Sequence, residues 1–189
     1  DIDSVLFDTT KFIKWRNTKI QEVAQIDNDK AEKIFSEAEI ACFEQCGGYE
    51  LRCWAEQVAQ ALGNEDILPK LVKTLEEIVY DNFHYQQVKL VLDAFIENER
   101  FTIGVQSEGD QKTQRDKLGQ FIACFNPSYM FFYQTDKINS LGRDITGHLS
   151  EVKSRIIVID DQPEAILKLQ NAGIRAILVK QGRHTEETG

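Results

Sequence analysis

SRIIVIDDQPE, residues 154–164, is the stretch that decides the predicted fold. Residues 156–159 are four consecutive β-branched aliphatic residues, a run typical of a parallel strand that is buried on both faces. Asp160 and Asp161 follow at its carboxyl end. Buried carboxylates repel one another unless a cation offsets their charge, so we expect this strand to end in a crevice that holds a cation. A hard divalent metal such as Mg²⁺ suits oxygen ligands of this kind.

The totals are those of an ordinary soluble globular protein. The chain has 189 residues, 42% of them hydrophobic, which is enough for one large domain or for a core with an insertion. Its net charge of −9 argues against partners such as nucleic acid or anionic membranes. A small anionic substrate could bind only where a metal and a few cationic side chains reverse the local field. Neither a membrane-spanning run nor a signal peptide is recognisable, so we expect a cytoplasmic protein.

The four cysteines, Cys42, Cys46, Cys53 and Cys124, do not form a zinc motif in the sequence. Cys42 and Cys46 are four residues apart on an expected helix, hence on one face, but no histidine lies near enough to complete a ligand set. We therefore expect reduced, partly buried thiols.

The first half of the chain has helical periodicity from about residue 11 to residue 97. Asp8 or Thr9 is expected to cap the first helix, Gly47-Gly48 to end the second, and Gly63-Asn64 to end the third. The pattern predicts a bundle of roughly four helices.

After residue 100 the pattern changes to alternating strands and helices. Strands are expected at 101–105, 129–133, 156–159 and 176–179, and helices at 110–118, 136–148 and 163–171. Such alternation predicts a parallel sheet covered by helices on both faces, with ligands at the carboxyl ends of the strands.

Four groups of polar residues at expected strand ends or nearby carry a resemblance. Asp1-Ile2-Asp3, Ser107, Lys137 and Asp160-Asp161, in this order, resemble the four motifs of the haloacid dehalogenase-like (HAD) hydrolase superfamily, in its type with a helical (C1) cap. The resemblance implies an α/β fold with a Rossmann-like parallel sheet core, made of residues 1–10 and 84–189. Residues 11–83 would be a helical-bundle cap inserted after the first motif.

The resemblance also implies a role for each residue. Asp1 would attack phosphorus and form an aspartyl-phosphate, while Asp3 would protonate the leaving group and then activate water. Ser107 would hydrogen-bond a phosphoryl oxygen, and Lys137 would neutralise charge on nucleophile and phosphoryl group. Asp161 would bind Mg²⁺ with Asp1 and the backbone carbonyl of Asp3, and Asp160 would assist.

The function implied is a Mg²⁺-dependent phosphatase acting on a small phosphorylated metabolite. The second carboxylate, Asp3, favours phosphoryl transfer over carbon–halogen cleavage. Substrate selection is expected on cap residues such as Trp15, Arg16, Lys19, Tyr49 and Arg52.

Simpler interpretations of the same residues stay open. Asp160 and Asp161 could cap the helix that begins at Pro163, Ser107 could be a turn residue, and Lys137 could be a solvated helix residue. Lys112, Lys117 and Lys153 compete with Lys137 for its role.

Two larger alternatives also remain. In a second register Val5-Leu6-Phe7 is the strand and Asp8 the nucleophile. In the other, the chain is a catalytically degenerate binding or interaction protein on a HAD-type fold.

Overall fold

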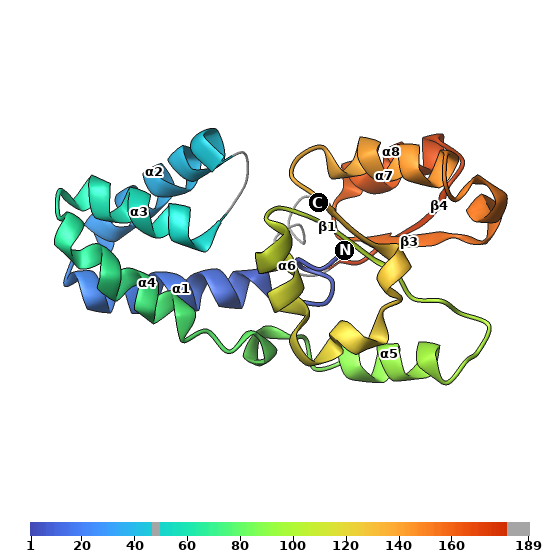
Figure 1. The fold of residues 1–189 in the computed structure, drawn as a ribbon, viewed down its shortest axis with the longest axis horizontal. Coiled ribbons are helices and arrows are strands. Elements are labelled where there is room, and N and C mark those ends of the chain that lie inside the picture. Colours follow the sequence, from blue (N-terminus) through green and yellow to red (C-terminus); the bar gives the residue numbers. More distant parts are fainter. Residues whose placement is uncertain (47–49, 181–189) are drawn as a thin grey trace.

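The computed structural model describes residues 1–46 and 50–180. Helices α1 to α4 lie on one side of the molecule, and strands β1 to β4 lie with α7 and α8 on the other (Figure 1). The described helices are α1 (Thr9–Ala24), α2 (Asn28–Cys46), α3 (Leu51–Leu62), α4 (Leu68–Glu76), α5 (Val88–Ile96), α6 (Gln111–Leu118), α7 (Lys137–Thr146) and α8 (Pro163–Asn171). The strands are β1 (Val105–Glu108), β2 (Met130–Tyr133), β3 (Ile157–Asp160) and β4 (Arg175–Leu178), and short 3₁₀ turns connect several elements.

Local capping signals explain where the first helices begin and end. Asp8 Oδ1 accepts a hydrogen bond from the Lys11 amide at 2.9 Å, so its predicted role as the cap of α1 is confirmed. Gly63 ends α3 as predicted, with a φ of +63° that favours glycine. Gly47-Gly48 lies outside the described residues.

Helices α1 to α4 share one hydrophobic core. Trp54, Val58, Leu71 and Ile20 are buried at its centre. A second core joins the first residues of the chain to its second half, because Ile2 and Phe7 pack with residues such as Phe83, Val105 and Leu118. A third lies between α7, α8 and the β3–β4 pair.

The predicted Rossmann-like parallel sheet core is wrong. The described chain is mostly helical, and its four strands of four residues form two separate parallel pairs, β1–β2 and β3–β4. No described strand joins the two pairs. Residues 1–7 form a tight turn and extend neither pair: the amides of Val5, Leu6 and Phe7 all donate to Ile2 O. Backbone groups used within this turn are not available to a sheet ladder.

The strand at 156–159 was also expected to be buried on both faces, and this is wrong for the described residues. Val158 is buried against α7 and α8, but Ile157 is 45% exposed on the opposite face. Ile177, on the same face of β4, is 51% exposed. The pair β3–β4 is therefore covered by helices on one side.

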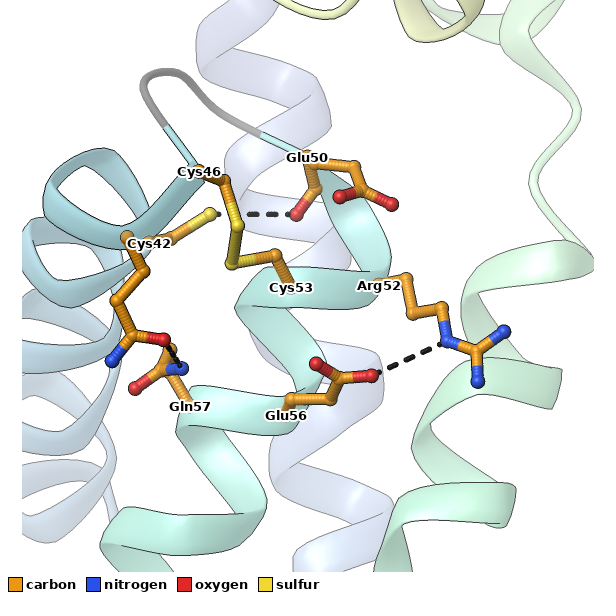
Figure 2. The surroundings of a disulfide bond; sticks show 8 residues. Cys42, Cys46, Glu50, Arg52, Cys53, Glu56 and Gln57 are labelled. Carbon is orange, nitrogen blue, oxygen red and sulfur yellow. Dashed lines mark hydrogen bonds and ion pairs between the residues drawn. A yellow bond between two sulfur atoms is a disulfide. The ribbon is translucent and has the colours of Figure 1, made fainter.

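The cysteines also differ from expectation. Cys46, the last residue of α2, forms a disulfide with Cys53 in the first turn of α3, so not all thiols are reduced (Figure 2). The two helices pack side by side, which brings together residues seven positions apart in the sequence. Cys42 and Cys124 lie outside this disulfide.

Among residues 1–46 and 50–180, no helix is both long and apolar enough to cross a membrane.

Candidate functional site

Three carboxylates from the two ends of the chain meet at the carboxyl end of β3. Asp160 is the last residue of that strand and Asp161 follows it; both are buried. The backbone nitrogen of Asp1 donates to Ile159 O at 2.8 Å, which fixes Asp1 beside the strand. Carboxylate oxygens of Asp1, Asp160 and Asp161 all lie within 4.8 Å of one another. The structure thus brings together three of the predicted site residues.

Lys137 completes this cluster. Its Nζ donates to Asp1 Oδ2 at 2.6 Å and to Asp160 Oδ2 at 3.0 Å, and the residue is only 3% exposed. Lys137 is the first residue of α7, and its backbone amide donates to Glu108 Oε2 at 2.9 Å. Glu108 ends β1, so this contact holds the start of α7 against the strand end. The interpretation of Lys137 as a solvated helix residue is wrong.

Asp160 is bound from several sides. Besides the Lys137 ammonium, its carboxylate accepts hydrogen bonds from Gln106 Nε2 and the Gln162 amide, each at 3.0 Å. Burial alone raises the pKa of this carboxyl, but Lys137 and the hydrogen bonds outweigh it and hold the pKa below its ordinary value of 3.8.

The bond to Gln162 ties Asp160 to the residue that precedes the following helix. Asp160 Oδ1 accepts from the backbone amide just before α8, while Oδ2 faces Lys137 and Gln106. Because Gln162 is itself the N-cap residue of α8 and no described side chain caps that helix, the interpretation of Asp160 and Asp161 as helix caps is not confirmed.

Asp3 lies apart from the carboxylate cluster and has a lysine of its own. Lys117 Nζ, on α6, donates to both Asp3 oxygens at 2.8 and 2.9 Å, and Thr9 Oγ1 donates at 2.7 Å. Both side chains of this ion pair are largely buried. Lys117 therefore does not take the predicted place of Lys137; it serves a different aspartate.

Ser107 is buried at the end of β1 and links to Asp3 through one side chain. Its Oγ donates to Gln114 Oε1 at 3.0 Å, and Gln114 Nε2 donates to Glu108 O at 2.9 Å and more weakly to Asp3 Oδ2 at 3.4 Å. Ser107 is thus part of a polar network, which the turn interpretation did not foresee.

The remaining alternatives fall elsewhere. Asp8 is occupied in capping α1. Lys112 pairs with Asp116 and Lys153 donates to Ala172 O, both on the surface. Neither lysine is among the contacts of the cluster described above.

The residues expected to select the substrate differ in their exposure to solvent. Arg16 is buried in the helical segment, with its guanidinium 4.0 Å from the centre of the Trp54 ring. Such burial gives Arg16 a packing role. Arg52 is exposed, Trp15 and Lys19 are half-buried, and Tyr49 lies outside the described residues.

Sequence reasoning missed Gln106 and Gln114 and did not give Lys117 a partner. Gln106 connects β1 to Asp160, and Gln114 connects Ser107 to Asp3. The signal in the sequence was Gln106, a polar residue between Val105 and Ser107. A polar side chain that is buried in a strand needs a hydrogen-bond partner.

The donor set fits a hard divalent cation. Asp1, Asp160 and Asp161 offer only carboxylate oxygens, which Mg²⁺ prefers, and they lie close enough together to share one ion. The ammonium of Lys137 offsets one of three negative charges, so a divalent cation would balance the rest. The Asp3 carboxylate is not a member of this group.

Comparison with protein-family models and with curated proteins finds no match for this chain.

Proposed function

We propose that this protein is a Mg²⁺-dependent phosphatase that hydrolyses a small phosphorylated metabolite through an aspartyl-phosphate. The observation that carries the proposal is the contact of Lys137 with both Asp1 and Asp160, with Asp161 beside them. A nucleophilic carboxylate, a buried ammonium and a hard-metal ligand set in one place match what phosphoryl transfer needs. A cytoplasmic location goes with a metabolite substrate and is part of the proposal.

Asp1 is the proposed nucleophile because its carboxylate is oriented. Oδ1 accepts from the Ile2 amide at 2.7 Å and Oδ2 accepts from Lys137 at 2.6 Å, which limits rotation of the side chain. In the first step a new bond forms between an Asp1 oxygen and phosphorus, and the bond from phosphorus to the ester oxygen breaks. Lys137, already in contact with the nucleophile, would stabilise the charge on the phosphoryl oxygens.

Mg²⁺ would be held by Asp1 and Asp161, with Asp160 assisting and the Asp3 carbonyl as a further ligand. When bound, it would neutralise the phosphoryl group and orient it for attack.

Asp3 is the proposed acid and base. It would give a proton to the leaving oxygen and later take one from the water that hydrolyses the aspartyl-phosphate. In the structure its carboxylate accepts from Lys117 and Thr9. The acid role therefore requires the substrate to loosen the contact between Asp3 and Lys117. Ser107 would turn from Gln114 to a phosphoryl oxygen in the same complex.

The helical segment 11–83 would act as the cap that selects the substrate and excludes water. Arg52 and Lys19, which keep exposure to solvent, are better placed for an anionic substrate than the buried Arg16.

The Asp3–Lys117 ion pair also favours a second candidate, a binding or interaction protein without phosphatase activity. If this pair does not open, the leaving group has no proton donor.

Release of phosphate from p-nitrophenyl phosphate and a panel of sugar phosphates tests the proposal, with MgCl₂ compared to EDTA. We expect Mg²⁺-dependent hydrolysis that Asp1→Asn abolishes and Asp3→Asn reduces by about 10²–10⁴-fold. Asp8→Asn is the matched control, because Asn caps a helix as well as Asp does. Loss of activity in Asp8→Asn but not in Asp1→Asn would establish the other register. No hydrolysis of any substrate would favour the binding protein.

A further inference from the structure

Three cysteines from two helices form a cluster in the helical segment, away from the carboxylates. The sulfur atoms of Cys42 and Cys46, on α2, and of Cys53, on α3, all lie within 4.8 Å of one another. Figure 2 shows the Cys42 sulfur next to the disulfide that joins the other two. Cys42 and Cys53 are buried and Cys46 is exposed. No step of the proposed phosphatase reaction uses these residues.

We propose that, when reduced, Cys42, Cys46 and Cys53 bind one soft metal ion such as Zn²⁺, and that the disulfide of the structure is the metal-free, oxidised form of this site.

The spacing of the three sulfurs fits a thiolate site. Zinc–sulfur bonds of about 2.3 Å in tetrahedral geometry place sulfur atoms roughly 3.8 Å apart. The three sulfurs already lie within 4.8 Å of one another, and those of Cys46 and Cys53, which are bonded to each other in the structure, would separate to this spacing on reduction. Soft thiolate ligands select Zn²⁺ or Cu⁺ over Mg²⁺, so this site and the carboxylate site would take different metals.

The backbone positions also suit a metal. The Cα atoms of Cys46 and Cys53 are 7.1 Å apart, whereas disulfides usually join Cα atoms separated by about 4.4–6.8 Å. Two thiolates on either side of a metal ion span this separation readily. Because Cys46 is exposed, solvent can reach the site and supply the fourth ligand.

The two forms interconvert by balanced chemistry. A dithiol reduces the disulfide with two electrons and two protons, which breaks the sulfur–sulfur bond and gives two thiols. Metal binding then replaces the protons of three S–H groups, including the one that Cys42 directs at Glu50 O, 3.6 Å away. In the reverse direction hydrogen peroxide takes two electrons from the Cys46 and Cys53 thiolates and two protons from solvent and is reduced to two waters. The sulfur–sulfur bond re-forms, the metal is released, and the Cys42 thiolate takes a proton from solvent.

A cobalt titration of the full chain tests the proposal. The protein is reduced with a phosphine under anaerobic conditions and titrated with Co²⁺, whose charge-transfer absorption reports thiolate ligands. We expect one Co²⁺ per chain with this absorption, displacement by Zn²⁺, and loss of the absorption on treatment with peroxide. Co²⁺ bound by the carboxylates of Asp1, Asp160 and Asp161 would not give the thiolate signal.

Variants identify the ligands. Cys46→Ser removes an exposed residue and should weaken Co²⁺ binding by more than about 100-fold while the far-ultraviolet circular dichroism stays unchanged. Cys42→Ser should retain the disulfide under oxidising conditions but lose the metal, which distinguishes a three-thiolate site from a simple disulfide. Cys124→Ser, outside the cluster, is the matched control and should bind as the parent does.

An absent thiolate signal in the reduced parent would overturn the proposal, as would an undiminished signal in Cys46→Ser. An undiminished signal in a folded Cys42→Ser would overturn the three-ligand set. If Cys42→Ser does not fold, the comparison of Cys46→Ser with Cys124→Ser decides.

Discussion

Replacing Lys137 by methionine tests the carboxylate cluster most directly. Methionine keeps a long apolar side chain but removes the ammonium that contacts Asp1 at 2.6 Å and Asp160 at 3.0 Å. The variant therefore leaves buried carboxylates close together without that cation, while changing the packing volume little.

The structure gives the size of the effect. The side chains of Lys137 and Asp1 are 3% and 4% exposed, and that of Asp160 is fully buried, so solvent screens these charges little. Removing one partner of such a buried pair lowers stability by about 3–5 kcal/mol. The free energy of unfolding of an ordinary domain is about 5–15 kcal/mol, so a loss of this size is a large part of the total.

Urea unfolding at neutral pH, with and without Mg²⁺, is the assay. Lys112→Met is the matched control. Lys112 also forms an ion pair, with Asp116 at 2.8 Å, but its side chain is 84% exposed to solvent. Such a surface pair contributes about 0–1 kcal/mol. Mg²⁺ at about 100 times its dissociation constant should add about 2.7 kcal/mol to the parent. We expect at least as large a gain in Lys137→Met, because the carboxylates then lack their ammonium.

Two results would refute this reasoning. If Lys137→Met loses no more stability than Lys112→Met, the carboxylates do not depend on the ammonium. If Mg²⁺ stabilises neither the parent nor Lys137→Met, the cluster is not a metal site, and the proposed phosphatase loses its main support.

Three further predictions follow from other contacts. The pKa of Asp160 lies below its ordinary value of 3.8, so the stability its carboxylate provides is complete above that pH and is lost as pH falls below it; the acid-unfolding curve of Asp160→Asn should lack this component. Lys117→Met should lower the free energy of unfolding by about 3 kcal/mol, and adding Asp3→Asn should restore part of the loss in a double-mutant cycle measured in urea. Leu71→Ala, in the core of the helical segment, should cost about 2–5 kcal/mol in thermal or urea unfolding, whereas Leu90→Ala, at a residue 72% exposed, should stay within about 0.5 kcal/mol.

Local signals in the sequence predicted the helices well. The amide-capping oxygen of Asp8 and the left-handed φ of Gly63 are properties of a few neighbouring residues, so α1 and α3 could be bounded from the sequence. Helix α8 begins at Pro163 and ends at Asn171, as predicted, because proline suits the first helical turn.

Long-range pairing could not be predicted in the same way. Alternating strands and helices suggested one sheet, but the alternation does not say whether β1 and β3 share a neighbour. The turn at residues 1–7 uses its amides internally, and β1 and β3 remain in separate pairs. Likewise, the contact of Lys117 with Asp3 and the disulfide of Cys46 depend on how helices pack, which no local pattern encodes.

The proposed site is held together by side chains where a continuous sheet would have used backbone bonds. Gln106 joins β1 to Asp160, Glu108 holds the first residue of α7, and Lys137 bridges Asp1 and Asp160. The links made by Gln106 and Lys137 end on carboxylates of the site. A cation that binds the carboxylates would therefore also strengthen the connection between the two strand pairs. For this reason metal affinity and stability should change together in variants of Gln106 and Lys137, whereas variants in the core of α1 to α4 should change stability alone.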